Sequence, residues 1–140
     1  MKLTLEKAVN LFVAAKAIDY NEVKIDKINL IWVELLRYAK MWDDAMMEVE
    51  KDREKVSKPF VEEYQQLSEE EKKVKGPELQ KKLEEKLSGL TSVKAQAELM
   101  KKEFDVDLPT LTKDELVAIS KSKAFKNIGE SGIFGILLEG

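Results

Sequence analysis

Apolar residues recur at alternating steps of three and four between Ile25 and Val56, and no glycine or proline interrupts this stretch. This period is typical of a helix that packs one face against another helix. We call the row the seam, and Arg53 is its single polar member. Its apolar members are Ile25, Ile28, Trp32, Leu35, Ala39, Trp42, Met46, Val49 and Val56. The sequence therefore predicts one long helix whose apolar row must be covered.

The length of this helix limits how the seam can be covered. At about 1.5 Å per residue, a helix over residues 25–56 is about 48 Å long. A compact domain of 140 residues has a diameter of only about 37 Å. The helix must therefore bend, carry a second helix along its length, or pair with another chain. Burial of each large apolar side chain contributes about 1.5–3 kcal/mol, so we expect the seam to be hidden in this chain or against a neighbour.

Residues 1–57 predict an N-terminal helical hairpin. Thr4 is placed to cap a first helix, because its hydroxyl can accept a hydrogen bond from an amide of the first turn. An apolar row that starts at Leu5 follows, and the polar segment Asp19–Glu22 ends this helix. The link to the long helix is short, which favours an antiparallel pair.

Residues 58–103 predict a charged helical arm. Acidic and basic side chains alternate along it in similar numbers, which is typical of a solvated helical surface. Apolar residues still recur at Phe60, Tyr64, Leu67, Leu79, Leu83 and Leu87. Pro59 predicts a kink or a short break, because proline lacks an amide donor and disfavours helix at the preceding residue.

Glycine and proline also divide the arm into predicted helices. Gly76-Pro77 predicts a turn, with Pro77 at the start of the next helix. Gly89 is a typical helix end, and Thr91 is placed to cap a further helix that reaches Phe104.

For residues 104–140 we predict a small segment of extended chain and short helices. Val106–Leu111 alternates and contains a proline, which favours an extended segment or an edge strand. Thr112 and Glu115 form the pattern of a capping box, so a short helix starts there. The apolar stretch Ile133–Leu138 predicts a strand or a core plug. Together these elements predict a single, mainly α domain, residues 1–140.

Composition excludes several kinds of chemistry. The chain has no histidine and no cysteine. It therefore lacks disulfides, thiolate nucleophiles, serine–histidine triads and the histidine ligands of di-iron bundles. We predict no enzymatic activity, no cofactor and a cytoplasmic location. The formal charge of −3 gives no reason to expect DNA or an anionic membrane as a partner.

Two motifs near the ends of the chain resemble a known group of proteins. The first is Ile25-Asp26-Lys27-Ile28-Asn29, which opens the long helix, and the second is Val106–Thr112 followed by Asp114-Glu115-Leu116. Together they are similar to small, mainly helical, uncharacterised proteins of tailed phages. The resemblance implies a phage-encoded protein in the host cytoplasm, in an accessory or host-directed role, and it carries no functional residues across.

Several side chains on or beside the seam are candidates for binding a ligand. Tyr38 and the two seam tryptophans lie near Arg37 and Lys40, a combination that can stack a base. The alternative is that the tryptophans are core residues and Tyr38 lies at the rim. Arg53 needs a carboxylate or phosphate partner if it is buried, and a neighbouring glutamate is the simplest one.

Two further clusters suggest sites. Asp44 and Glu48 share one helix face and offer two carboxylates to a divalent cation, but no comparable second motif exists, so we predict no metal site. Lysines and glycines near the C-terminus resemble a phosphate-binding loop without matching a known phosphate motif, and an ordinary exposed loop is the alternative. The lysines are Lys121, Lys123 and Lys126.

The sequence leaves three functional hypotheses open. The first is a binding protein that uses its heptad seam for oligomerisation or for capture of a partner helix, inhibiting or sequestering a host component such as a defence protein. The second is a small-ligand binder, such as a sponge for a nucleotide signal, that uses Tyr38, Arg53 and the C-terminal lysines. The third is a structural accessory of the phage particle.

Overall fold

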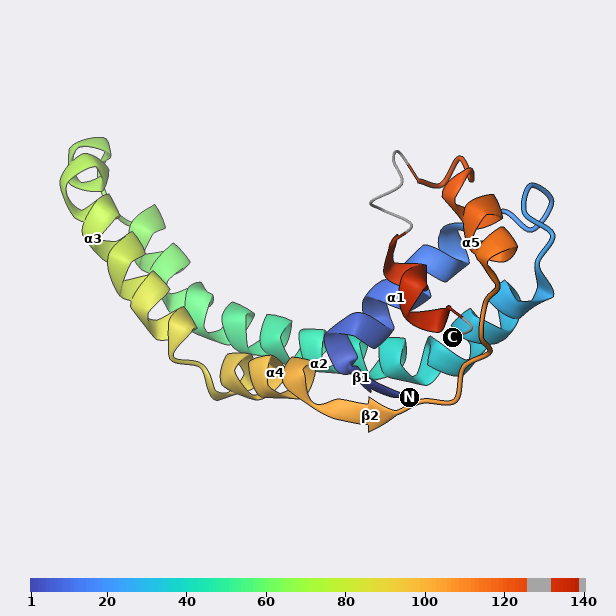
Figure 1. Cartoon of the computed structure of the whole chain (residues 1–140). Helices are drawn as coiled ribbons and strands as arrows, with labels where there is room; N and C mark the ends of the chain where they lie inside the picture. The colour runs from blue at the N-terminus through green and yellow to red at the C-terminus, as the bar shows by residue number, and fades with distance from the viewer. Residues whose placement is uncertain (126–131, 139–140) are drawn as a thin grey trace. The chain divides into compact units, whose positions relative to one another are not determined.

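The computed structural model describes residues 1–125 and 132–138, and this part of the chain is mainly helical. Figure 1 shows the order of its elements. They are β1 (Lys2–Thr4), α1 (Leu5–Ala17), α2 (Asp26–Gln65), α3 (Glu69–Ser88), α4 (Thr91–Lys101), β2 (Glu103–Asp105), α5 (Lys113–Ser120) and η1 (Gly132–Leu137). The predicted fold class is confirmed: a mainly α chain with an N-terminal hairpin, one long helix and a short C-terminal segment.

Contacts divide the chain into two compact units. The first unit combines Met1–Trp42 with Met100–Gly140, and the second is Asp43–Leu99. The boundary therefore falls within α2, before residue 57, where the sequence placed the end of the N-terminal hairpin. Since α2 and α4 each contribute residues to both units, neither unit corresponds to one predicted segment.

The first unit contains α1, the first part of α2 and the C-terminal elements. Thr4 caps α1 as predicted, because its hydroxyl accepts a hydrogen bond from the Lys7 amide at 3.2 Å. The short strands β1 and β2 pair in antiparallel register, with Leu3 opposite Phe104. The helix that starts at Thr91 is confirmed, but it ends at Lys101, because Phe104 pairs with Leu3 in the sheet.

The C-terminal segment completes the core of the first unit. The predicted capping box is present, since the Thr112 hydroxyl accepts from the Glu115 amide and the Glu115 carboxylate accepts from the Thr112 amide. The stretch Ile133–Leu138 forms the core plug, mostly as the 3-10 helix η1, which lies against α1 (Figure 1). Only its last residue makes a β-bridge, to Leu111. Fully buried core side chains of this unit include Leu5, Leu11, Ile31, Leu35, Leu111, Ile119, Phe134 and Leu137.

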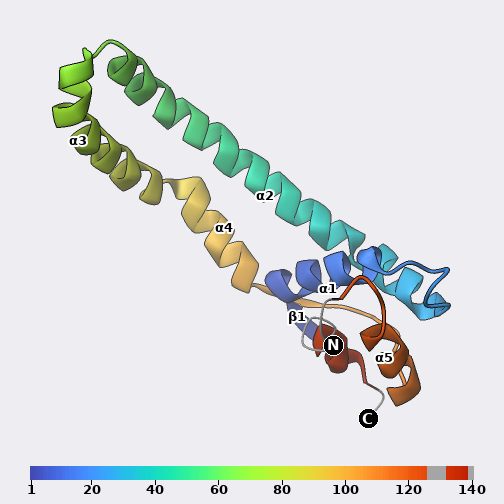
Figure 2. The same ribbon diagram turned by 90° about the horizontal axis from the view of Figure 1, so that it is seen from above.

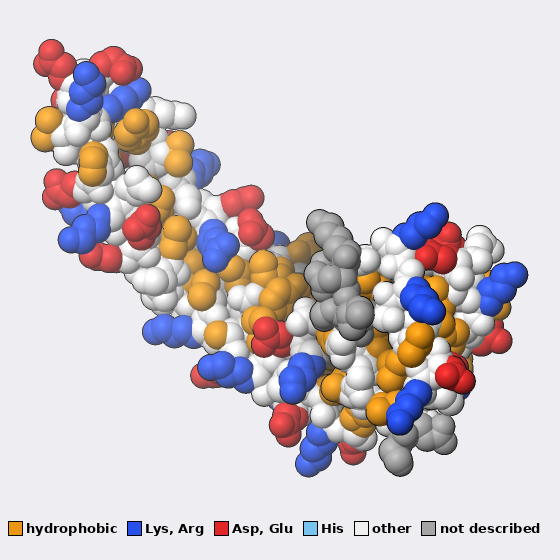
Figure 3. Space-filling model, turned by 45° about the horizontal axis from the view of Figure 1, so that its top comes forward, with side chains coloured by type: hydrophobic (Ala, Val, Ile, Leu, Met, Phe, Trp, Pro, Cys, Tyr) orange, Lys and Arg blue, Asp and Glu red, His pale blue; other side chains and the backbone are white. Residues whose placement is uncertain are grey.

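The second unit is an antiparallel helical hairpin. In Figure 2, α3 and α4 return alongside the later part of α2. The Lys72 ammonium lies 5.2 Å from the centre of the Tyr64 ring, and that of Lys86 lies 5.3 Å from the Phe60 ring. As the residue number increases along α3, the number of its contact partner on α2 decreases, as in an antiparallel pair of helices. Acidic and basic side chains are interspersed over the hairpin surface (Figure 3), as predicted for a charged helical arm.

The short break predicted as one alternative at Pro59 and the turn predicted at Gly76-Pro77 are both wrong. Helix α2 continues through Pro59 to Gln65, and the other alternative at this proline, a kink, stays a prediction. Helix α3 likewise continues through Gly76 and Pro77. Gly76 lacks the Cβ that would clash with the ring of a following proline, and it faces Tyr64, so the helix can pass this point. The chain instead reverses just before Ser68, which caps α3 in a capping box with Glu71.

Candidate interaction surface

Helix α2 is apolar on two opposite faces within the first unit. One face lies in the core, where Ile31 and Leu35 are fully buried. The opposite face has four exposed apolar side chains, which we call the outer face. They are Leu30, Val33, Leu36 and Met41, with exposed fractions of 60%, 55%, 47% and 40%. A surface helix normally places polar side chains opposite its core face, so this second apolar row is unusual.

An open, nearly flat surface patch lies at the middle of the outer face. Val33 and Leu36 form its apolar part, and Glu34, Arg37 and Lys40 complete its lining. The Arg37 guanidinium is held by two contacts: its Nη2 lies 3.1 Å from Oε1 of Glu34, and its Cζ lies 4.9 Å from the centre of the Tyr38 ring. An apolar centre with a charged rim is the usual composition of a protein–protein contact.

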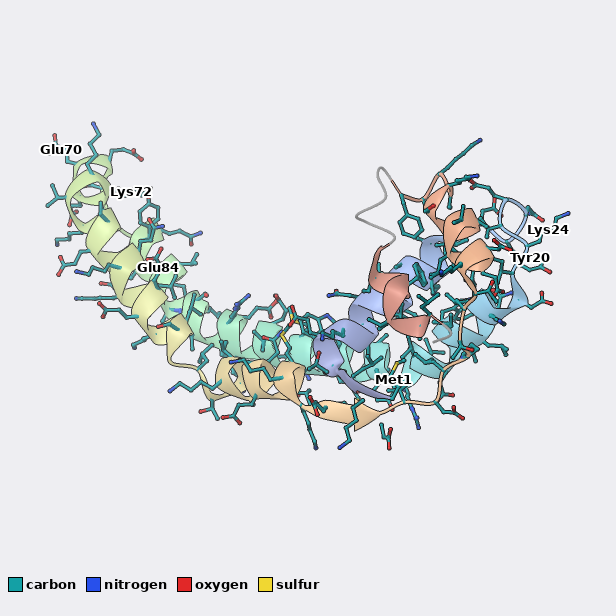
Figure 4. All side chains as sticks on the ribbon, viewed as in Figure 1. Met1, Tyr20, Lys24, Glu70, Lys72 and Glu84 are labelled. Atoms are coloured by element: carbon teal, nitrogen blue, oxygen red, sulfur yellow. The ribbon has the colours of Figure 1, made fainter. Side chains whose placement is uncertain are left out.

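The N-terminal end of α2 is fixed by two side-chain contacts. The Tyr20 hydroxyl, in the loop between α1 and α2 (Figure 4), donates to Oδ1 of Asp26 at 2.8 Å. This hydrogen bond to a carboxylate raises the pKa of Tyr20 above its usual value. At the next residue, Nζ of Lys27 donates to Oε1 of Glu115 at 2.8 Å, which joins α2 to α5. The N-terminal end of α2, where the outer face begins, is therefore held in place by contacts with the preceding loop and with α5.

The seam, which the sequence proposed as the interaction surface, lies mostly inside the chain. Ile28, Leu35 and Val49 are each 3% exposed or less, so other parts of the same chain cover them. Trp32 and Trp42 are half-buried, and the Trp32 indole donates to the Asn29 amide oxygen at 3.1 Å. The other apolar seam members, Ile25, Ala39, Met46 and Val56, are buried or half-buried. Covering the seam therefore requires no second chain, and the hairpin alternative accounts for its later part.

The candidate ligand-binding residues on α2 are separated by burial and by unit. Tyr38 is 4% exposed, and its ring centre lies 5.3 Å from that of Phe104 in the core of the first unit. Its ring is thus used within the protein, whereas the sequence placed it at the rim of the seam. Arg53 lies in the second unit, half-exposed, with Nη1 3.9 Å from Oε1 of Glu50. This weak surface pair is the neighbouring-glutamate arrangement that the sequence offered as the simpler alternative.

Of the C-terminal lysines, Lys121 and Lys123 lie in the turn that follows α5, and Lys126 lies outside the described residues. Lys121 and Lys123 are exposed. The backbone amide of Lys123 donates to a carboxylate oxygen of Glu22 at 2.7 Å. This amide donor, which a bound phosphate would need, is thus already used by a carboxylate of the protein. Among the described residues no cluster of carboxylates could hold a metal ion, and no helix has the length and apolar character needed to cross a bilayer.

Sequence reasoning overlooked the outer face because the seam accounted for the helix by itself. The signal was present, since Leu30, Val33 and Leu36 recur at three-residue steps, a spacing that keeps side chains near one face of a helix. Only the structure shows that a helix with two apolar rows buries one and exposes the other.

The chain matches no protein-family model, no curated protein and no solved structure. The resemblance to tailed-phage proteins therefore stays a prediction.

Proposed function

We propose that this protein is a non-enzymatic binding protein that acts by pairing a helix of its target, or of a second copy, with the outer face of α2. The observation that carries the proposal is the exposed row of Leu30, Val33, Leu36 and Met41 on a helix whose opposite face is already buried. Contiguous exposed apolar side chains of this kind are typical of interaction sites.

The charged rim supports the same function. Arg37 and Lys40 lie beside apolar side chains, which suits recognition of a helix with an apolar row and acidic flanks. The absence of histidine and cysteine argues against the commonest catalytic groups. Combined with the resemblance to tailed-phage proteins, these features favour a factor that inhibits or sequesters a host component, such as a defence protein.

Site-specific photocrosslinking in producing cells tests the proposal. A photoreactive amino acid replaces Val33 on the outer face or, as the matched control, Val117 on α5, which is 51% exposed. We expect protein adducts from position 33 and none from position 117. Equal labelling at the two positions, or no protein adduct from position 33, would contradict the proposal.

A further inference from the structure

We propose that the occupant of the outer face is a second copy of this chain, paired antiparallel through α2 with Val33 on the twofold axis. This inference rests on the proposed function and names its partner. Three observations carry it: the order of apolar side chains along the outer face, the charges at its two ends, and the exposure of all the residues involved.

Three of the four apolar side chains of the outer face are placed symmetrically about Val33, and Met41 lies outside this symmetric part. Leu30 and Leu36 lie three residues, or about 4.5 Å along the axis, on either side of it. In an antiparallel pair centred on Val33, each Val33 lies at the level of the other, and Leu30 of one copy lies at the level of Leu36 of the other. All three are about half-exposed, so they are available for such a contact. A symmetric dimer needs a self-complementary patch of this kind.

The charges favour the antiparallel arrangement over the parallel one. Asp26 and Lys40 lie seven residues, or about 10.5 Å, on either side of Val33, and both are exposed. In the antiparallel pair, each Asp26 carboxylate lies at the level of a Lys40 ammonium of the other copy. In a parallel pair in register, each Asp26, Arg37 and Lys40 would face its own like charge, which is unfavourable.

The Arg37 side chain fits the same arrangement. Arg37 lies four residues after Val33, at the level of Asn29 of the second copy, whose side-chain amide oxygen accepts from the Trp32 indole and has a second lone pair for another donor. Glu34 holds the guanidinium beside the apolar centre. The centre of the contact is thus apolar and its ends are charged, with opposite signs brought together at each end.

Two other surfaces of the chain could bind a partner or a ligand, but less about them indicates which one. A groove of about 520 Å³ in the second unit is lined by Phe60, Tyr64, Leu79 and Leu83 among others, but nothing identifies what would fill it. The Lys121–Lys123 turn has its amide bonded to Glu22. Only on the outer face does the placement of apolar and charged side chains indicate which partner would bind there.

Cysteine crosslinking measures the register directly, because the chain contains no cysteine of its own. Two packed helices lie about 8–10 Å apart, so facing residues come within reach of a disulfide or a short thiol crosslinker. The purified full chain is tested as Val33→Cys, as Leu30→Cys and Leu36→Cys singly and mixed, and as Val117→Cys for the control. All four positions are exposed, so these variants keep the core intact.

We expect Val33→Cys to form covalent dimers at a rate several-fold above Val117→Cys. We also expect mixed Leu30→Cys and Leu36→Cys to crosslink several-fold more than either alone. If Leu30→Cys and Leu36→Cys each crosslink to themselves as fast as the mixture, the antiparallel register is wrong. If the Val33→Cys rate equals that of the control, the second copy is not the occupant.

Charge reversal provides an independent readout by sedimentation velocity. Lys40→Asp places a carboxylate against Asp26 of the other copy and leaves the Tyr20–Asp26 hydrogen bond in place, so it should weaken dimerisation several-fold at low salt. A Lys40→Asp variant that dimerises as well as the wild type would overturn the pairing. If the chain is monomeric but position 33 still photocrosslinks to another protein in cells, this inference fails and the proposed function stands.

Discussion

Lys27 and Glu115 join α2 to α5 through a single carboxylate oxygen that has two donors. Oε1 of Glu115 accepts from Nζ of Lys27 at 2.8 Å and from the amide of Thr112 at 2.9 Å. The hydrogen bond from Lys27 is the main reason why the pKa of Glu115 lies below its usual value, and the Thr112 amide adds to it. Glu115, which completes the capping box of α5, therefore also positions α5 against the helix that has the outer face.

This arrangement predicts a pH-dependent contribution to stability. Because the pKa of Glu115 is lower in the folded chain than in the unfolded one, the ion pair stabilises the fold above the unfolded pKa of about 4.3. That stabilisation is lost as the pH falls through the folded pKa. Glu115→Gln keeps a side chain that can complete the capping box but removes the charge. We expect it to lower the free energy of unfolding at pH 7 by about 1 kcal/mol or less.

Urea unfolding at neutral and at acidic pH measures this effect. The difference between the wild type and Glu115→Gln should shrink towards zero in acid, whereas Glu98→Gln, at an exposed position of α4, should behave like the wild type throughout. A Glu115→Gln difference that is the same at every pH would show that the ion pair does not contribute.

A second prediction concerns Pro77 within α3. Proline inside a helix removes an intrahelical hydrogen bond and is about 3 kcal/mol less favourable than alanine. Since α3 continues through Pro77, Pro77→Ala should raise the free energy of unfolding of the chain by about 1–3 kcal/mol. Thermal unfolding followed by circular dichroism measures the change. A neutral or destabilising effect would instead indicate that a turn needs the proline at this position.

The third prediction compares two adjacent leucines of α2, one buried and one exposed. Leu35 is fully buried and Leu36 is 47% exposed. Leu35→Ala should lower the free energy of unfolding by about 2–5 kcal/mol, because it leaves a cavity in the core. Leu36→Ala should change it by about 0.5 kcal/mol or less in the monomer. Chemical denaturation of dilute protein tests both, and similar losses from the two variants would contradict the assignment of the faces.

A fourth prediction concerns the turn between α2 and α3. The Ser68 hydroxyl accepts a hydrogen bond from the Glu71 amide at 3.2 Å, and the lowered pKa of Glu71 results mainly from its hydrogen bonds with Ser68. Ser68→Ala should therefore destabilise the hairpin by about 1 kcal/mol. Ser57→Ala, inside α2, serves as the control, since alanine is the better helix former. Urea unfolding should separate the two variants, and equal midpoints would argue against this cap.

Much of the fold could be predicted because its local signals agree with its tertiary packing. Thr4, Thr112 and Gly89 have the roles that their residue types predict, and the seam lies in one uninterrupted helix. The prolines were misinterpreted for a tertiary reason. Keeping Pro59 and Pro77 inside a helix costs less free energy than the packed helices of the second unit gain by burying apolar side chains. The sequence does not show which helices will pack together.

The candidate site was less predictable than the fold. The seam and the outer face are both apolar, and a sequence cannot show which of two apolar faces the rest of the chain will cover. Tyr38 illustrates the difficulty, because its burial depends on Phe104, a residue far away in the sequence. Exposure, which identified the outer face, depends on the complete fold.

Sedimentation velocity over a range of protein concentrations tests the central claim most directly. It compares the wild type with the variant Leu30→Ser/Val33→Ser/Leu36→Ser, whose core face is unchanged. We predict a sedimentation coefficient that rises with concentration for the wild type and stays at the monomer value for the variant. Superimposable profiles for the two proteins at every concentration would contradict the claim that the outer face of α2 pairs with a second copy.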